Sequence, residues 1–514
     1  MGLNGPEPGV SSGSRITRRR VLQLYAAGAV TVSAGALAIG ELSGGPDRIL
    51  PESTEVAEGE QRRAKTGRVR PYDLVAAPAT IDLGGKLAHT WAFNGQLPRD
   101  AIRATPGDQL EVRVKNQLAS STSVHWHGLA LRNDMDGVPN LTRPAIGAGS
   151  EFTYRFTCPD PGTYWFHPHV GVQLDTGLMG PLIIEDPSEP LNYDQDVTLM
   201  LDDWTDGLSQ SPNQILSHLS SSGMNMDSMS GMDSMSPNST GIGITQSQPL
   251  GNDTGDVDYP LHLINGKPPT DPFIIRARPG SRLRLRLINA GSDTAYRFQI
   301  GDHQLNVVHT DGYPVQSKTV DSLIIGMGER YDVIVRAGDG AFPIVSTPLG
   351  KKNPPALAIL RSSATARKPK ATSHAPGQVL QYQDLQPEAS AALRKQNPAR
   401  TVQVDLTMRS GGRQWLINGK TYADHTPLDI KSGERLRLEM TNRTMMFHPM
   451  HLHGHTFALV QSRRPGVRKD TINVLPMHRL AIDVQADNPG QWLLHCHNAY
   501  HGELGMMTVL SYVR

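Results

Sequence analysis

The segment LINGKTYADHTPLDIKSGERLRLEMTNRT, residues 416–444, has two earlier counterparts in the chain. They are WAFNGQLPRDAIRATPGDQLEVRVKNQL, residues 91–118, and LINGKPPTDPFIIRARPGSRLRLRLINAG, residues 263–291. Each copy has an Asn-Gly turn and then a second Gly, which leads into a strand that alternates apolar and polar residues and ends at an Asn nine residues on. Three copies of one plan, spaced by roughly the length of a sandwich domain, predict three related β-sandwiches.

The composition agrees with an all-β fold. A chain of 514 residues is too long for a single core, and its 50 Gly and 38 Pro favour turns and short strands over long helices. With 50 Lys and Arg against 49 Asp and Glu, the net charge is +1, so the balance gives no support to a polyanionic partner such as nucleic acid.

Domain boundaries follow from the copies and from the segments between them. We expect a first domain at 71–190, a second at 191–365, a linker ARKPKATSHAPG at 366–377 and a third domain at 378–514. The boundary near 190 depends on EDPSEP alone.

The N-terminus has the features of a targeting segment. TRRRVLQ, residues 17–23, places paired arginines before an apolar run rich in Ala and Gly, and residues 1–40 resemble a twin-arginine export signal. The 19 residues from Val21 to Ile39 would also fit one membrane-spanning helix. We expect export to the periplasm, cell envelope or medium, membrane attachment only through an uncleaved signal, and a polar tether at 41–70.

Histidine is concentrated in four short motifs. Of 19 histidines, 11 lie in HWHG (125–128), HPH (167–169), HPMHLHGH (448–455) and HCHNAYH (495–501). Alternate side chains on a strand share a face, so each His-X-His pair can hold metal together: His125 and His127, His167 and His169, His451 and His453, His495 and His497. Two motifs belong to the first copy and two to the third, so the pairs can meet only if these two domains pack together.

Cys496 lies between two of these histidines and must face the opposite side of its strand. There it can meet His448, His501 and Met506, a set of two imidazoles, one thiolate and one weak thioether that is typical of a blue copper site. Structural zinc prefers four strong ligands. The alternative is a disulfide between Cys158 and Cys496, the only two cysteines. We disfavour it, because a Cys496 in a disulfide could not bind metal together with the neighbouring histidines.

The four motifs, in this order and in the first and last of three copies, resemble those of the multicopper oxidases, a family that includes laccases and cuprous oxidases. The resemblance covers residues 70–514 and implies three cupredoxin-like Greek-key β-sandwich domains and four copper ions. It implies a type 1 copper at His448, Cys496, His501 and Met506, a type 2 copper at His125 and His451, and a type 3 pair at His127, His167, His169, His453, His495 and His497. It implies no ligand role for His455 and no metal site in the second domain.

The same resemblance implies an oxidase that takes single electrons from phenols or metal ions and reduces dioxygen to two waters. Asp136, eleven residues after His125, matches the position of an acid that supplies protons in the family. Glu503 is a second candidate, although Gly502 stands where some relatives place the acid. Either carboxylate could equally be an ordinary surface or turn residue.

Methionines in two parts of the chain suggest which reductants the protein oxidises. An axial Met506 would lower the potential of the blue copper, which favours easily oxidised substrates: cuprous ion, electron-rich phenols, ferrous or manganous ion. Residues 220–241 form a low-complexity insertion, expected to be a mobile loop; its last four methionines recur every three residues, which would also fit one face of a short helix. Its soft thioethers favour Cu(I): Met224, Met226, Met229, Met232 and Met235. This indicates a copper-detoxifying oxidase, unless these methionines have no role.

Two other functions remain for comparison. A two-copper nitrite reductase would not need eight further paired histidines. A non-catalytic copper-binding, storage or structural member of the fold would be expected to lose ligands, whereas all ten histidine positions are filled here.

Overall fold

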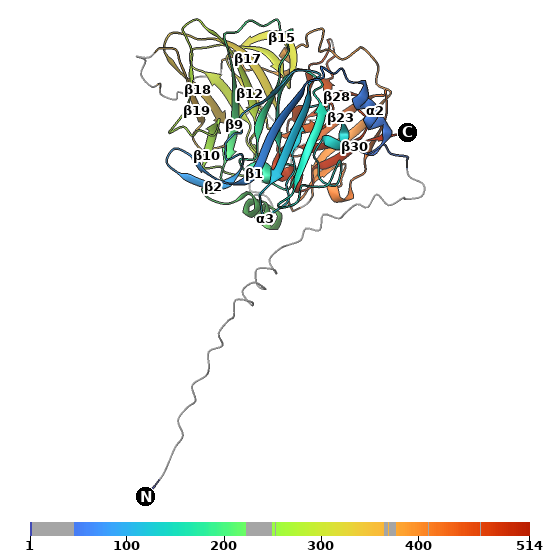
Figure 1. Ribbon diagram of the computed structural model, residues 1–514, viewed down its shortest axis with the longest axis horizontal. Coiled ribbons are helices and arrows are strands. Elements are labelled where there is room, and N and C mark those ends of the chain that lie inside the picture. The colour runs from blue at the N-terminus through green and yellow to red at the C-terminus, as the bar shows by residue number, and fades with distance from the viewer. Residues whose placement is uncertain are drawn as a thin grey trace, which may run out of the picture. The chain divides into compact units, whose positions relative to one another are not determined.

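The computed structural model describes residues 1–2, 46–222, 249–251, 253–363, 369, 377–409, 411–462 and 464–514. The chain divides into two units, Met1–Gly45 and Pro46–Arg514, and every element below belongs to the second. In Figure 1 the colours separate into three groups of strands, blue to teal, green to yellow, and orange to red. Each group forms two facing sheets, which confirms an all-β chain of three sandwiches.

The first sandwich pairs a sheet of order β2-β1-β4-β6 with a sheet of order β3-β8-β7-β5. Along β4, Leu110, Val112 and Val114 are buried in the core between partly or fully exposed residues, as the alternating sequence predicts. The strands are β1 (Val69–Asp82), β2 (Leu87–Phe93), β3 (Ile102–Ala104), β4 (Gln109–Asn116), β5 (His125–His127), β6 (Glu151–Thr157), β7 (Gly162–His167) and β8 (Gly180–Ile184).

The second sandwich has sheets of order β10-β9-β12-β17-β14-β15 and β11-β19-β18-β13-β16. Its strands are β9 (Gln195–Trp204), β10 (Leu261–Ile264), β11 (Phe273–Arg276), β12 (Arg282–Asn289), β13 (Tyr296–Ile300), β14 (Leu305–Thr310), β15 (Tyr313–Val320), β16 (Leu323–Ile325), β17 (Arg330–Arg336), β18 (Ala341–Pro348) and β19 (Ala356–Arg361). Leu380 and Leu385 also lie in its core, so residues after the predicted linker run along this sandwich. The predicted domain boundaries stay predictions.

The third sandwich has sheets of order β21-β20-β23-β28-β25-β26 and β22-β30-β29-β24-β27. Its strands are β20 (Arg400–Met408), β21 (Trp415–Ile417), β22 (Leu428–Lys431), β23 (Arg435–Asn442), β24 (His448–Leu452), β25 (Phe457–Leu459), β26 (Arg468–Lys469), β27 (Thr471–Val474), β28 (Arg479–Gln485), β29 (Gln491–Cys496) and β30 (Met507–Val513). In all three sandwiches the first strand in the sequence runs parallel to the strand that follows the second Gly of the repeat. The pairs are β1 with β4, β9 with β12, and β20 with β23.

The three repeated segments begin with turns of the same backbone conformation in all three sandwiches. Asn94, Asn265 and Asn418 all adopt left-handed backbone, with φ of 56°, 51° and 53°, and the Gly that follows each also has positive φ. This is the conformation of a tight two-residue hairpin turn. Each carboxamide then bonds to the backbone of a neighbouring strand: Asn94 to β1, Asn265 to β9 and Asn418 to β20.

The asparagine that ends the copy also repeats its bonds. The Nδ2 groups of Asn116, Asn289 and Asn442 each donate to a carbonyl on a distant segment, Ile146, Ile325 and Val474 respectively. Each Oδ1 accepts from a backbone amide two residues on. These buried carboxamides therefore join separate parts of each sandwich through satisfied hydrogen bonds.

Among the described residues, three α-helices accompany the strands: α2 (Thr54–Arg62), α3 (Pro212–Ser222) and α4 (Ala499–Glu503). Helix α2 differs from the expected polar tether at 41–70, because its Val56, together with Ile49, lies in the core of the third sandwich. Single apolar residues in a polar stretch carry too weak a periodicity to reveal this packing. Short 3-10 turns add η1 (Asn133–Met135), η2 (Gln173–Asp175), η5 (Tyr382–Asp384) and η6 (Tyr422–Asp424).

The predicted export signal lies almost wholly outside the described residues. Within the part of the chain that the structure describes, no helix is both long and apolar enough to cross a membrane. The two cysteines form no disulfide: Cys158 is buried in the first core and Cys496 in the third.

Candidate metal centres

Two paired strands of the third sandwich place metal-binding side chains on opposite faces. β24 runs antiparallel to β29, with His451 opposite His495 and Met450 opposite Cys496. Because side chains alternate along a strand, Cys496 points away from the two flanking histidines. It enters the apolar core together with Met450 and Met506.

A compact group of one sulfur and two imidazoles forms on the core side. Cys496 Sγ lies 3.7 Å from His448 Nδ1 and 3.6 Å from His501 Nδ1, and the two nitrogens are 3.2 Å apart. All three side chains are buried, and the Trp415 ring packs 4.1 Å from that of His501. We refer to His448, Cys496 and His501 as the thiolate site. Met506 is buried in the same apolar core.

The thiolate site favours positive charge. Burial opposes protonation of His501, but its hydrogen bond to Asp256 and the neighbouring Cys496 outweigh this and raise the pKa of His501 to about 10. His501 Nε2 lies 3.0 Å from Asp256 Oδ2. A bound cation would provide the charge that these surroundings favour.

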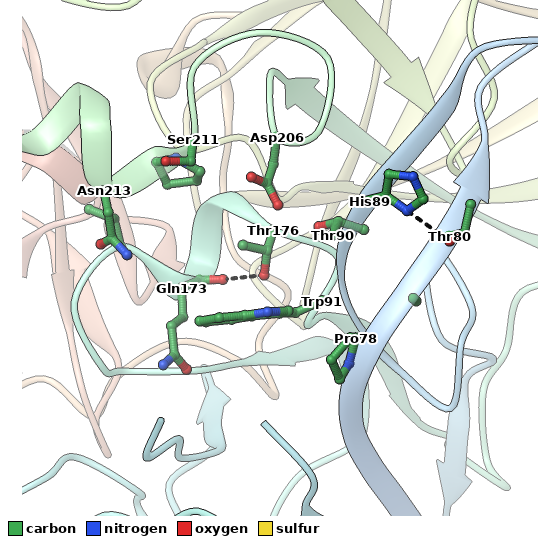
Figure 2. A pocket seen from close by; sticks show the side chains of 13 residues that line it. Pro78, Thr80, His89, Thr90, Trp91, Gln173, Thr176, Asp206, Ser211 and Asn213 are labelled. Carbon is green, nitrogen blue, oxygen red and sulfur yellow. Dashed lines mark hydrogen bonds between the residues drawn. The ribbon is translucent and has the colours of Figure 1, made fainter. Parts of the chain in front are cut away.

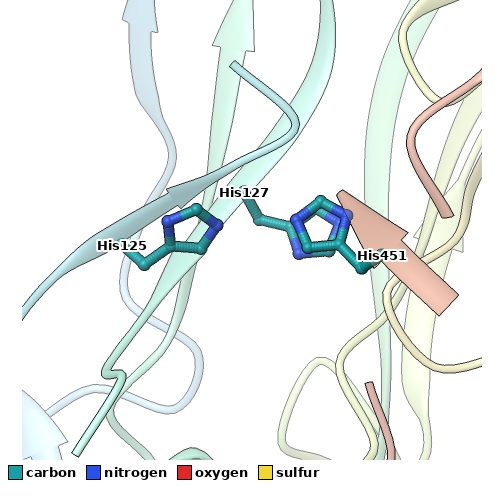
Figure 3. Close-up of side chains that lie close together, drawn as sticks. All are labelled: His125, His127 and His451. Carbon is teal, nitrogen blue, oxygen red and sulfur yellow. The ribbon is translucent and has the colours of Figure 1, made fainter. Parts of the chain in front are cut away.

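Eight further histidines meet where the first and third sandwiches pack together. Their ring nitrogens fall into three groups with spacings below 4.8 Å: His125 with His127 and His451, His127 with His167 and His497, and His169 with His453 and His495. We refer to these eight residues as the histidine cluster. Figure 3 shows that His125 and His127 reach from one strand toward His451 on another, and the His127 and His451 rings stack at 3.8 Å.

One ring nitrogen of several cluster histidines is held by a carbonyl oxygen. The Nδ1 atoms of His125, His167, His451 and His495 lie 2.9 to 3.0 Å from backbone carbonyls. A carbonyl only accepts, so each Nδ1 carries the hydrogen and each Nε2 keeps a lone pair. Among the described residues, Nε2 of His125, His167 and His451 has no hydrogen-bond partner.

The cluster therefore fits metal ions. Buried polar atoms without partners are rare, and here several converge on one place. Burial, with smaller contributions from neighbouring rings, lowers the pKa of six members well below the usual range: His127, His167, His169, His453, His495 and His497. They stay neutral, and neutral imidazole is the form that binds metal.

The structure places Asp136 within the cluster. Its carboxylate is fully buried, Oδ2 lies 2.9 Å from His453 Nδ1, and Oδ1 lies 3.2 Å from His125 Nδ1. It therefore contacts one histidine from each of the two sandwiches.

Glu503 lies at the end of helix α4 beside the other face of the cluster. It lines a narrow cavity of about 30 Å³ together with His169 and His495, which leaves room for water. Glu503 is exposed at the surface, but the protein packed around its carboxyl raises the pKa of Glu503 to about 7 through desolvation.

Three residues that contact these sites had no signal in the sequence. Asp256 bonds His501, Asp470 bonds His127 and His451, and Arg330 bonds Asp470. Each is one charge among others in an ordinary stretch, so neither motif nor spacing marks it.

The five methionines Met224, Met226, Met229, Met232 and Met235 lie outside the described residues. The segments that flank them are described. Ile215 and Leu219 of α3 pack with Tyr500, next to His501, and Asp253 pairs with Met446, close to His448. Both flanks of the insertion therefore border the thiolate site.

A surface pocket of about 430 Å³ lies elsewhere. It is bounded by β1, β2 and the loop before α3, and its walls include His89, Trp91, Thr176 and Asp206 (Figure 2). None of the cluster histidines is among the described residues that line it.

Comparison with known proteins gives a consistent result. Multicopper oxidase profiles match residues 76–189, 195–365 and 395–513. The chain is 42% identical to the multicopper oxidase MmcO of Mycobacterium tuberculosis, over 98% of this chain and 99% of that protein. It is 29% identical to copper resistance protein A of Escherichia coli, over 85% of this chain and 91% of that protein.

Solved structures agree with this match. A laccase from Botrytis aclada superposes with a TM-score of 0.74 at 27% identity, over 89% of each chain. A multicopper oxidase from Campylobacter jejuni, described as a metallo-oxidase, superposes with a TM-score of 0.64 at 25% identity, over 87% of this chain and 92% of that one. The three sandwiches are therefore of the cupredoxin type.

Proposed function

Because this chain belongs to the multicopper oxidase family, we propose that its physiological reductant is cuprous ion and that the electron would enter the thiolate site beside His501. The chain is a copper-dependent oxidoreductase that couples one-electron oxidation of a reductant to four-electron reduction of dioxygen to water. The observation that carries this function is the proximity of the thiolate site and the histidine cluster, which share strand β29.

The family uses one type 1, one type 2 and two type 3 copper ions, and the residues present fit this set. We propose that the thiolate site and Met506 hold the type 1 copper, and that His125 and His451 hold the type 2 copper. The type 3 pair is assigned to His127, His167, His169, His453, His495 and His497. Bound copper supplies the redox chemistry, storing single electrons and delivering four of them to dioxygen.

The protein links the thiolate site to the histidine cluster through the backbone and keeps both sites away from bulk water. Cys496 is flanked by His495 and His497, so one backbone step on either side joins the residue that carries the sulfur to the cluster. Every side chain of the thiolate site and all cluster histidines but the half-buried His169 are buried, which excludes bulk water. A reductant at the surface is thereby separated from the place where dioxygen reacts.

Protons must reach the cluster, and two carboxylates support this role. Asp136 touches His453 and His125 directly. Glu503, with a pKa near 7, can hold and release a proton at neutral pH beside the cavity that it shares with His169 and His495. We assign proton supply to these two residues.

Three observations support cuprous ion as reductant. The Met-rich segment offers soft thioether ligands, and its described flanks border the thiolate site. Asp256 places a carboxylate against His501, which would attract a cation. Several relatives are named copper resistance proteins.

The decisive experiment measures oxygen uptake by the copper-loaded protein with Cu(I), a phenol and Fe(II), with and without residues 220–241. We expect the deletion to slow Cu(I) oxidation and leave phenol oxidation unchanged. An unchanged Cu(I) rate would remove the role of the insertion. Copper binding without oxygen uptake with any reductant would instead indicate a non-catalytic copper carrier.

We also propose export through the twin-arginine segment, since laccases and copper resistance proteins are among its relatives. Replacing Arg18 and Arg19 by Lys should retain the protein in the cytoplasm of a bacterial host, as cell fractionation would detect. Normal export of this variant would contradict the assignment.

A further inference from the structure

A carboxylate outside the predicted ligand set lies against two cluster histidines. Asp470, between β26 and β27, is fully buried, and its Oδ1 lies 3.2 Å from His127 Nε2. Its backbone carbonyl lies 3.0 Å from His451 Nδ1. Thr471 Oγ1 supports the same two nitrogens at 3.2 and 3.1 Å. One short segment therefore contacts a histidine of the first sandwich and one of the third.

The second sandwich holds this carboxylate in place. Arg330, at the start of β17, donates from its two terminal nitrogens to the two oxygens of Asp470, each at 2.6 Å. Its Nε donates to the carbonyl of Thr163 on β7, the strand that ends in His167. Arg330 is itself fully buried, and a planar guanidinium bound at both ends has one orientation.

The backbone around Asp470 is fixed as well. Asp311, also from the second sandwich, accepts from the amides of Asp470 and Thr471 at 3.1 and 3.2 Å. Gly128 lies close to the Arg330–Asp470 pair, because a Cβ added to Gly128 would overlap both side chains. Arg330 thus holds the carboxylate, Asp311 holds the backbone beside it, and Gly128 packs closely against both charged groups.

These contacts decide which nitrogen of each ring can bind metal. Since a carboxylate and a carbonyl can only accept, His127 must carry its hydrogen on Nε2 and His451 on Nδ1. The opposite atoms, His127 Nδ1 and His451 Nε2, have no partner among the residues described. His127 is therefore turned around relative to His125, His167 and His451, which present Nε2.

We propose that Asp470, clamped by Arg330, is a positioning residue of the trinuclear copper site, fixing the tautomer and ring orientation of His127 and His451. This inference rests on the proposed copper assignment, and it gives the second sandwich, which supplies no ligand, a direct part in building the site. Carboxylates that orient metal-bound histidines typically contribute 10- to 100-fold to metal affinity or activity.

The test compares Asp470→Asn with Asp332→Asn in copper-loaded full-length protein. Asp332 is the matched control, because it is a buried aspartate on β17 that pairs with Arg284 and Arg286 rather than with a cluster histidine. Copper content is followed during titration with a chelator. The blue absorption reports the type 1 site, the near-ultraviolet absorption reports the type 3 pair, and electron paramagnetic resonance reports the type 2 copper, because a coupled type 3 pair gives no such signal.

We expect Asp470→Asn to keep the blue band and to lose cluster copper at roughly 10- to 100-fold lower chelator concentration than the control variant. Should it fold poorly, Arg330→Lys retains the charge but loses the two-pronged contact, and a smaller change in the same type 3 signals is expected. Equal cluster copper and equal type 3 signals in Asp470→Asn and Asp332→Asn would overturn the proposal. A wild type without a blue band would instead contradict the proposed function itself.

Discussion

At the scale of single residues, the thiolate site includes a contact that could not be predicted from the sequence, the hydrogen bond between Asp256 and His501. Asp256 lies two residues before the exposed Asp258 in an ordinary acidic stretch, yet only Asp256 bonds His501, at 3.0 Å. The residues of the thiolate site and the histidine cluster could be predicted because strand alternation and the His-X-His spacing are local. Asp256 could not be predicted, since its contact with a residue 245 positions away depends on how two sandwiches pack.

We predict that Asp256→Asn weakens the use of cationic reductants. Loss of the carboxylate removes the negative charge that would attract a cation to the surface beside His501, so kcat/KM for Cu(I) should fall about 10-fold relative to a neutral phenol. Steady-state oxygen uptake with both reductants measures the ratio. Asp258→Asn serves as the control, and an equal loss with both reductants would contradict a role in reductant binding.

We predict that Glu503 gives oxygen reduction its pH dependence. Its pKa is raised to about 7, so it holds a proton below pH 7 and loses it as the pH rises through that value. Rates in the wild type should therefore decline from pH 6 to pH 8. Glu503→Gln cannot donate, and the rate should fall roughly 10²-fold and lose this inflection.

Stopped-flow measurement of reoxidation by dioxygen separates this step from reductant oxidation. Glu52→Gln, at an exposed position, is the control. An inflection near pH 7 that survives in Glu503→Gln would assign the proton to another group.

At the scale of elements, the three copies show how much of the fold the sequence contains. The Asn-Gly turns at 94, 265 and 418 were predictable because left-handed backbone limits the residues that can occupy them. The strands after Gly107, Gly280 and Gly433 were predictable from their alternation. Helix α2 was not, because one buried Val56 in a polar stretch gives no period.

We predict that Asn289→Ala destabilises the second sandwich without affecting copper. Its carboxamide bonds Thr294 and Ile325 carbonyls and the Gly291 amide, so truncation leaves three buried backbone groups unsatisfied. The expected cost is about 3 kcal/mol, or roughly 5–10 °C in Tm by calorimetry. Asn306→Ala, at a half-buried position with one weak bond, should change Tm far less.

At the scale of the whole molecule, the histidine cluster joins the first and third sandwiches, and the second reaches it through other contacts. Packing of the first on the third was predictable, since the paired motifs lie in these two copies. The part played by the second was not. Arg330 and Asp470 are 140 residues apart, and no pattern links them. Gly328 is a second contact of this kind between the second sandwich and the cluster, because a Cβ added to it would overlap His127 and His497.

We predict that copper at the cluster stabilises this three-part assembly more than copper at the thiolate site does. Cluster metal joins residues from two sandwiches, whereas His448, Cys496 and His501 all belong to the third. Ligand binding at about 1,000 times Kd contributes about 4 kcal/mol, and only cluster copper should add it to the contact between sandwiches. His167→Ala should therefore lose most of the copper-induced rise in Tm and expose β5 and β24 to hydrogen exchange, while Cys496→Ser keeps both. Equal losses in the two variants would mean that the cluster does not hold the sandwiches together.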